Sequence, residues 1–62
     1  MRALLYLKEH GAVIGGAEAS LEDDLRLHET DAIGVVLSDL EWRTAIVDIT
    51  DPSNPTPKQK DQ

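Results

Sequence analysis

Residues 3–15 read ALLYLKEHGAVIG, and this stretch decides which fold class the chain enters. Two short apolar runs flank a polar segment that ends in a glycine. The pattern fits a strand over 3–8, a turn over 9–11 and a strand over 12–15. A helix over 2–10 fits the same residues, because short apolar runs do not separate the two periods. We expect the hairpin.

The next segment predicts a short helix. Gly15 and Gly16 are typical of a break between elements. Ser20 and the three acidic residues that begin two positions later match a helix-capping pattern, and the dipole favours acids in a first helical turn. We therefore expect a helix over 21–28. The alternative is a strand over 24–29, in which leucines alternate with polar residues.

The second half of the chain predicts another hairpin. Residues 32–37 form a continuous apolar run, typical of a strand buried on both faces. Residues 42–50 are rich in β-branched side chains, and a turn over 38–41 joins the two strands. Residues 52–62 contain three prolines and no aliphatic side chain. We expect a disordered, proline-rich tail there, after a single small domain over 1–51.

These elements predict an α+β fold, with a small antiparallel sheet of about four strands and one short helix packed on it. The alternative is a five-strand all-β barrel that uses residues 24–29 as its third strand. A chain of 62 residues without cysteine has a small core and no disulfides or thiolate metal sites. Such a chain gains stability by association, so we expect a homo-oligomer.

Charge limits the partners of this protein. The chain has twelve acidic and six basic residues, which gives a net charge of −6. Eleven of the carboxylates lie between Glu9 and Asp51, where there are only two arginines. A surface this acidic repels nucleic acid and anionic membranes and attracts basic protein surfaces. We expect a basic protein surface as the partner, with no direct nucleic-acid binding and no membrane contact.

Candidate binding residues fall into an acidic group and an aromatic–basic pair. The densest acidic run, Glu22 to Asp24, fits a contact for a basic partner, although an acidic first helical turn is the more ordinary explanation. Trp42 and Arg43 are residue types enriched at binding hot spots, and Trp42 also fits the core. The predicted partner-binding residues are Glu18, Glu22, Asp23, Asp24, Glu29, Asp31, Trp42 and Arg43.

No sequence pattern indicates catalysis, a metal or a cofactor. His10 and His28 lack the converging ligands that zinc needs, and no phosphate-binding glycine motif occurs. We expect neither cofactor nor metal, and no enzymatic activity. The sequence shows no secretory signal and no apolar span, so we expect a cytoplasmic protein.

The expected function is therefore that of a small acidic protein-binding module, an inhibitor of a basic nucleic-acid-binding partner. Phage anti-defence proteins such as anti-CRISPR proteins share this profile in size and charge only. The alternative is a homo-oligomeric structural or assembly subunit. It is indicated by the apolar segment 32–37, which a chain this small can hardly cover.

Overall fold

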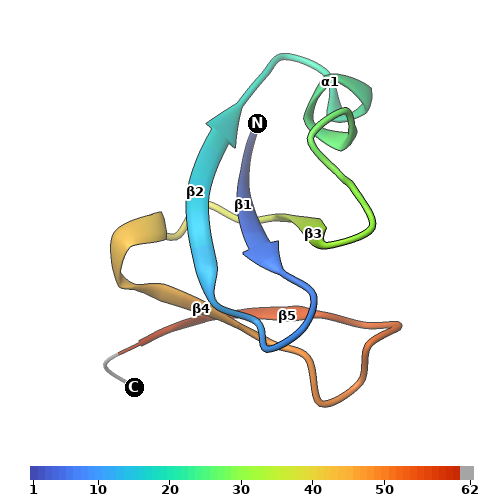
Figure 1. Cartoon of the computed structure of the whole chain (residues 1–62). Coiled ribbons are helices and arrows are strands. Elements are labelled where there is room, and N and C mark those ends of the chain that lie inside the picture. Colours follow the sequence, from blue (N-terminus) through green and yellow to red (C-terminus); the bar gives the residue numbers. More distant parts are fainter. Residues whose placement is uncertain (61–62) are drawn as a thin grey trace.

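Two antiparallel sheets form most of the regular secondary structure in residues 1–60, the part of the chain that the computed structural model describes (Figure 1). A three-stranded sheet has the order β2-β1-β3, and a second sheet pairs β4 with β5. One α-helix and one 3-10 turn complete the fold. The elements in chain order are β1 (Arg2–Leu7), β2 (Val13–Glu18), α1 (Glu22–Arg26), β3 (Ile33–Leu37), η1 (Trp42–Thr44), β4 (Ala45–Asp48) and β5 (Thr56–Gln59).

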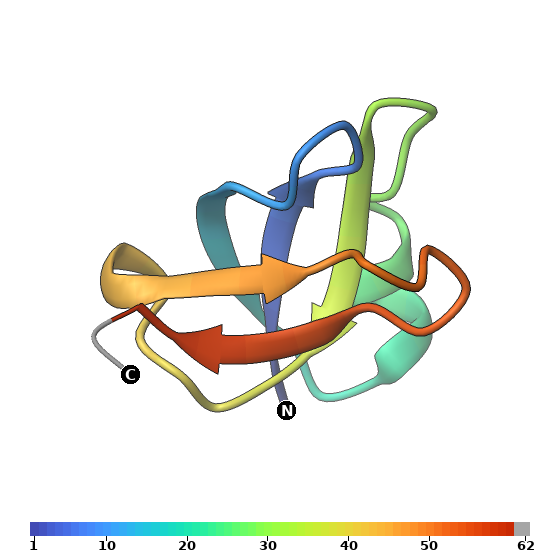
Figure 2. The ribbon, with the colours of Figure 1, turned by 90° about the horizontal axis from the view of Figure 1, so that it is seen from below.

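The chain forms three layers, with the three-stranded sheet in the middle. Figure 2 shows the β4–β5 hairpin running across one face of this sheet, while α1 lies against the other side. Successive side chains of a strand point to opposite faces, so the central strand β1 supplies both cores. The core beneath the hairpin contains Leu4, Tyr6, Ala45 and Val47. The core beneath the helix contains Ala3, Leu25 and Val35.

The first predicted hairpin is confirmed, but its second strand is longer than expected. β1 and β2 pair from Arg2 with Glu18 to Tyr6 with Val13. Gly15 and Gly16, expected to break the chain, lie inside β2. A Cβ at Gly16 would stand 2.8 Å from Cδ1 of Trp42, because the indole ring lies directly on this glycine. The glycine therefore serves a close approach rather than a break.

The second predicted hairpin is wrong in its pairing. β3 pairs with β1 and β4 pairs with β5, so the expected strand partners 32–37 and 42–50 lie in different sheets. The expected strand over 42–50 is also split into η1 and β4. The apolar run of β3 is explained by its place between the two cores, which buries or half-buries both of its faces.

The segment expected to be a disordered tail contributes a strand. Residues 56–59 of the range 52–62 form β5, although Pro57 lies opposite Val47 in the ladder. Lys60 N–H donates to the carbonyl of Thr44 at 2.7 Å, which makes the alternate pairs the bonded ones. The missing N–H of Pro57 would therefore point away from β4, so the proline costs no ladder bond. The last two residues of the expected tail lie outside the described residues.

The helix is confirmed but shorter than predicted, and its cap is different. α1 ends at Arg26, and Leu21 rather than Ser20 occupies the cap position, without a side-chain hydrogen bond. Residues 24–29 lie in this helix and the segment after it, not in a strand. With five strands and one short helix, the fold is mostly β rather than α+β, and residues 1–60 form no closed barrel.

Candidate protein-binding surface

The predicted binding residues lie on two different layers of the molecule. Glu22, Asp23 and Asp24 belong to α1, and Glu29 and Asp31 follow between α1 and β3, with Glu18 at the end of β2. Trp42 and Arg43 form part of η1, which packs on the opposite face of the three-stranded sheet. The acidic group and the aromatic–basic pair therefore do not make one patch. Of the acidic group, only Glu18 shares a hollow with Trp42, of about 250 Å³.

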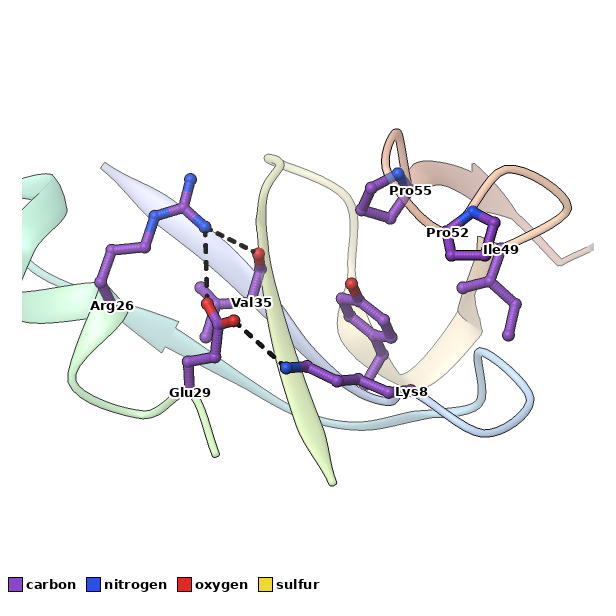
Figure 3. A pocket seen from close by; sticks show the side chains of 8 residues that line it. Lys8, Arg26, Glu29, Val35, Ile49, Pro52 and Pro55 are labelled. Atoms are coloured by element: carbon purple, nitrogen blue, oxygen red, sulfur yellow. Dashed lines mark hydrogen bonds and ion pairs between the residues drawn. The ribbon is translucent and has the colours of Figure 1, made fainter. Parts of the chain in front are cut away.

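Arg26 holds two of the predicted acids in an internal network, and Figure 3 shows its contacts with Glu29 and Val35. Its Nη2 lies 3.0 Å from Oε2 of Glu22, one helical turn earlier. Its Nη1 donates to the carbonyl of Val35 at 3.1 Å and lies 3.9 Å from Oε1 of Glu29. The second oxygen of Glu29 accepts from Nζ of Lys8 at 3.2 Å. Arg26 therefore joins α1 to β3, and Glu29 links Arg26 to Lys8 just after β1, a structural role that the sequence does not reveal.

Four predicted acids form no ion pair within the described residues. Arg26 is the only Lys or Arg between Lys8 and Arg43, and its guanidinium is used by the network just described. Within residues 1–60 the remaining acidic side chains of the group are exposed and form no ion pair. These carboxylates, here called the open acids, are Glu18, Asp23, Asp24 and Asp31.

Two exposed leucines flank the helix beside the open acids. Leu21 is 63% exposed and Leu27 is 80% exposed, while Leu25 between them is fully buried. The sequence places Leu21 and Leu25 on one face of a longer helix. Because α1 spans only Glu22–Arg26, the two outer leucines lie beyond its ends and remain in solvent. Sequence reasoning misses these leucines, since helical spacing alone would bury Leu21.

Trp42 is primarily a packing residue in this structure. Its ring is half-buried over Gly16 and packs against the core beneath the hairpin. The guanidinium carbon of Arg43 lies 4.8 Å from the ring centroid, within cation–π distance. Nη1 of Arg43 is also 2.9 Å from Oε1 of Glu41. η1 thus holds Arg43 beside the Trp42 ring, and the Arg43 side chain is exposed to solvent.

Asp48 shows a titration shift with a structural cause. Hydrogen bonds from the side chain and backbone N–H of Thr50, together with the Lys58 ammonium 2.9 Å from Oδ2, hold the pKa of Asp48 well below its ordinary range. Lys58 belongs to β5 and Asp48 to β4. The carboxylate therefore joins the two strands of the hairpin, and no substrate-sized cleft is needed to explain its pKa.

The described residues offer no metal centre. Among residues 1–60, no three histidine or carboxylate side chains converge closely enough to hold an ion. In the same range, no helix has the length and apolar composition that crossing a membrane requires. The surface around α1 thus stands as the candidate site, on the strength of its open acids.

No family model, curated protein or solved structure matches this chain.

Proposed function

We propose that this chain is a small protein-binding module whose open acids contact a basic surface of another protein. The observation that supports this proposal is that Arg26 is engaged in contacts within the protein. This cation pairs with Glu22 and Glu29 and bonds to Val35, and no other cation of residues 1–60 pairs with Asp23, Asp24 or Asp31. An uncompensated acidic surface attracts basic partners and speeds their association.

The partner class follows from charge and from the exposed leucines. Proteins that bind nucleic acid carry the most concentrated basic surfaces, since they neutralise phosphates with lysine and arginine. Carboxylates spread around α1 would compete for such a surface, which makes inhibition of nucleic-acid binding the expected consequence. Leu21 and Leu27 would add apolar contact area within the charged rim.

A homo-oligomeric assembly subunit is the second candidate. It is favoured by partly exposed apolar side chains on the two outer strands of the three-stranded sheet, Ile14 on β2 and Leu37 on β3. The net charge of −6 opposes association of two copies at low salt. Sedimentation equilibrium at micromolar concentration, at low and high salt, decides whether a dimer forms.

The test compares two double variants that lose the same charge. Asp23→Asn with Asp24→Asn removes two open acids, while Glu9→Gln with Asp51→Asn removes two exposed acids in the loops beyond β1 and β4. Poly-lysine and a basic protein captured from a lysate serve as probes, and the association rate is measured at low salt. We expect the first variant to associate about three- to tenfold more slowly, because each exposed ion pair contributes roughly 0.2–1 kcal/mol.

The control variant should change the rate far less. Equal losses in the two variants would mean that net charge alone drives binding and would remove the case for a surface around α1. Melting temperatures of both variants exclude a loss of folding as the cause.

A further inference from the structure

An imidazole closes the turn of the first hairpin. Ala12 N–H donates to Nδ1 of His10 at 3.3 Å, and within residues 1–60 it has no other partner. In an antiparallel pair it would donate to the carbonyl of Leu7, since Leu7 N–H donates to the Ala12 carbonyl at 2.9 Å. That carbonyl instead accepts from Gly11 N–H at 2.8 Å and from His10 N–H at 3.3 Å. The imidazole therefore replaces a missing ladder bond.

This contact requires the neutral ring. A ring nitrogen that accepts from an N–H carries no proton of its own, so the neutral imidazole of His10 holds its proton on Nε2. Protonation places a second ring N–H on Nδ1, where it would point at the N–H of Ala12 and break the bond. Because Ala12 is half-buried, water replaces the lost partner only in part.

The same turn attaches the β1–β2 hairpin to the β4–β5 hairpin. Val47 N–H of β4 donates to the carbonyl of Gly11 at 3.0 Å, and Ala12 lies opposite Ile46 in an antiparallel bridge. Figure 1 shows the turn between β1 and β2 lying beside β4. Gly11 is itself buried at this joint. A ring that holds Ala12 in place therefore also holds the joint between the two hairpins.

The charged groups around the ring keep their charge in the range where histidine titrates. A hollow of about 410 Å³ is lined by His10 together with Asp48 and Lys58 of the second hairpin, which pair with each other at 2.9 Å. In the turn itself, Lys8 is held in an ion pair, whereas Glu9 is exposed and forms no ion pair within residues 1–60. Carboxylates and lysines ordinarily titrate outside about pH 5–7.5, so His10 is the group of this joint that changes charge there.

We propose that His10 makes the joint between the two hairpins sensitive to pH, closed while the imidazole is neutral and loosened when it is protonated. This inference is independent of the proposed acidic surface. An ordinary histidine titrates near about pH 6.5. Because the folded turn binds the neutral ring, the joint is closed above this range and opens as pH falls through it. The opening is local, since the two cores lie outside the turn.

Amide hydrogen exchange on the full chain, from about pH 7.5 to about pH 5, tests the proposal. Rates are converted to protection factors, which removes the pH dependence of intrinsic exchange. We expect the protection factor of Ala12 to fall about fivefold, the change that the loss of one net hydrogen bond produces. The Val47 amide should lose protection with the same midpoint. In the same samples, the ¹⁵N shifts of the His10 ring report its protonation and which nitrogen carries the proton.

Variants at position 10 separate the titration from the contact. His10→Asn places an amide oxygen where Nδ1 lies, since both atoms are bonded to Cγ, and this acceptor does not titrate. We expect it to keep Ala12 protected across the whole pH range. His10→Ala has no acceptor, so Ala12 should be as weakly protected at high pH as in the unaltered chain at low pH. His28→Asn removes the other histidine, which follows α1, and should preserve the fivefold fall.

Three results would overturn the proposal. A ring that titrates while the protection of Ala12 stays constant would show that the Nδ1 contact does not hold the turn. A fall in protection that persists in His10→Asn would assign the pH dependence to another group. If the variants at position 10 do not fold, the ring shifts of the unaltered chain decide the point. A neutral ring with its proton on Nδ1 would rule out the contact, and a proton on Nε2 with the midpoint seen at Ala12 would support it.

Discussion

At the scale of single residues, close approaches explain positions that composition leaves ambiguous. Gly11 has φ +80° and its carbonyl accepts from Val47 N–H at 3.0 Å, so the turn of the first hairpin is fixed to β4. Trp42 lies on Gly16 in the same manner, ring against backbone. Both glycines are specified by a partner more than twenty residues away, which no local pattern can indicate.

Gly11→Ala should destabilise the protein, and Gly15→Ala should not. A Cβ at Gly11 would meet the Val47 carbonyl oxygen, and its positive φ disfavours any side chain. A Cβ at Gly15 meets only Cδ1 of Leu5, at 4.0 Å. We expect the first change to lower the free energy of unfolding by roughly 1–3 kcal/mol and the second to leave it within about 0.5 kcal/mol. Urea unfolding measures both, and equal values would show that Gly11 is not constrained.

At the scale of elements, the sequence predicts structure that depends on local signals, and it does not predict which distant strands pair. The β1–β2 hairpin was predictable because two apolar runs flank a turn within one short stretch. The pairing of β3 with β1 was not, since neighbouring strands in sequence usually pair and nothing local marks an exception. β5 escaped prediction because Thr56–Gln59 has no aliphatic residue, and its place depends on the open side of β4. The binding surface was likewise predictable only in part. Its acidity is visible in the sequence, whereas the contacts that Arg26 makes within the protein are not.

Ending the chain at Asp51 should therefore lower its stability. The truncation removes β5, unpairs the outer side of β4 and deletes the Lys58 ammonium that pairs with Asp48. We expect the melting temperature to fall by roughly 5–10 °C, the equivalent of one to two kcal/mol in a domain of this size. Thermal unfolding followed by circular dichroism measures the change. An unaltered midpoint would mean that β5 contributes nothing to the fold.

The same hairpin should make stability depend on pH in acid. The pKa of Asp48 is lowered in the folded chain by Thr50 and Lys58, whereas an unfolded aspartate titrates near about 3.9. Its contribution is therefore present above about pH 4 and lost as pH falls through the folded pKa. We expect Asp48→Asn to lower the melting temperature at neutral pH and to flatten its decline below about pH 4. Thermal unfolding of both proteins from neutral to acid pH, followed by circular dichroism, measures the difference, and an equally steep decline in the variant would contradict a stabilising role of the Asp48 carboxylate.

At the scale of the whole molecule, the distribution of charged residues lowers the stability of the fold. Each described ion pair joins exposed or half-exposed side chains, and such pairs contribute little. The open acids form no ion pair within residues 1–60, so they repel the other carboxylates in a chain of net charge −6. Residues that reduce stability persist where they serve binding, because function and stability commonly conflict at such sites. The proposed surface should therefore be detectable as an effect of charge on the stability of the fold.

Salt should stabilise this protein, and removal of open acids should reduce the effect. The Debye length falls from about 30 Å at 0.01 M to about 3 Å at 1 M, which screens repulsion between exposed carboxylates. We expect the melting temperature in sodium chloride to rise by a few degrees across this range. Asp23→Asn with Asp24→Asn should raise the low-salt value and shorten the rise. Glu22→Gln, which removes the ion pair with Arg26, should instead lower it. A midpoint that falls as salt is added would mean that ion pairs outweigh repulsion, and the open acids would then need no partner to account for them.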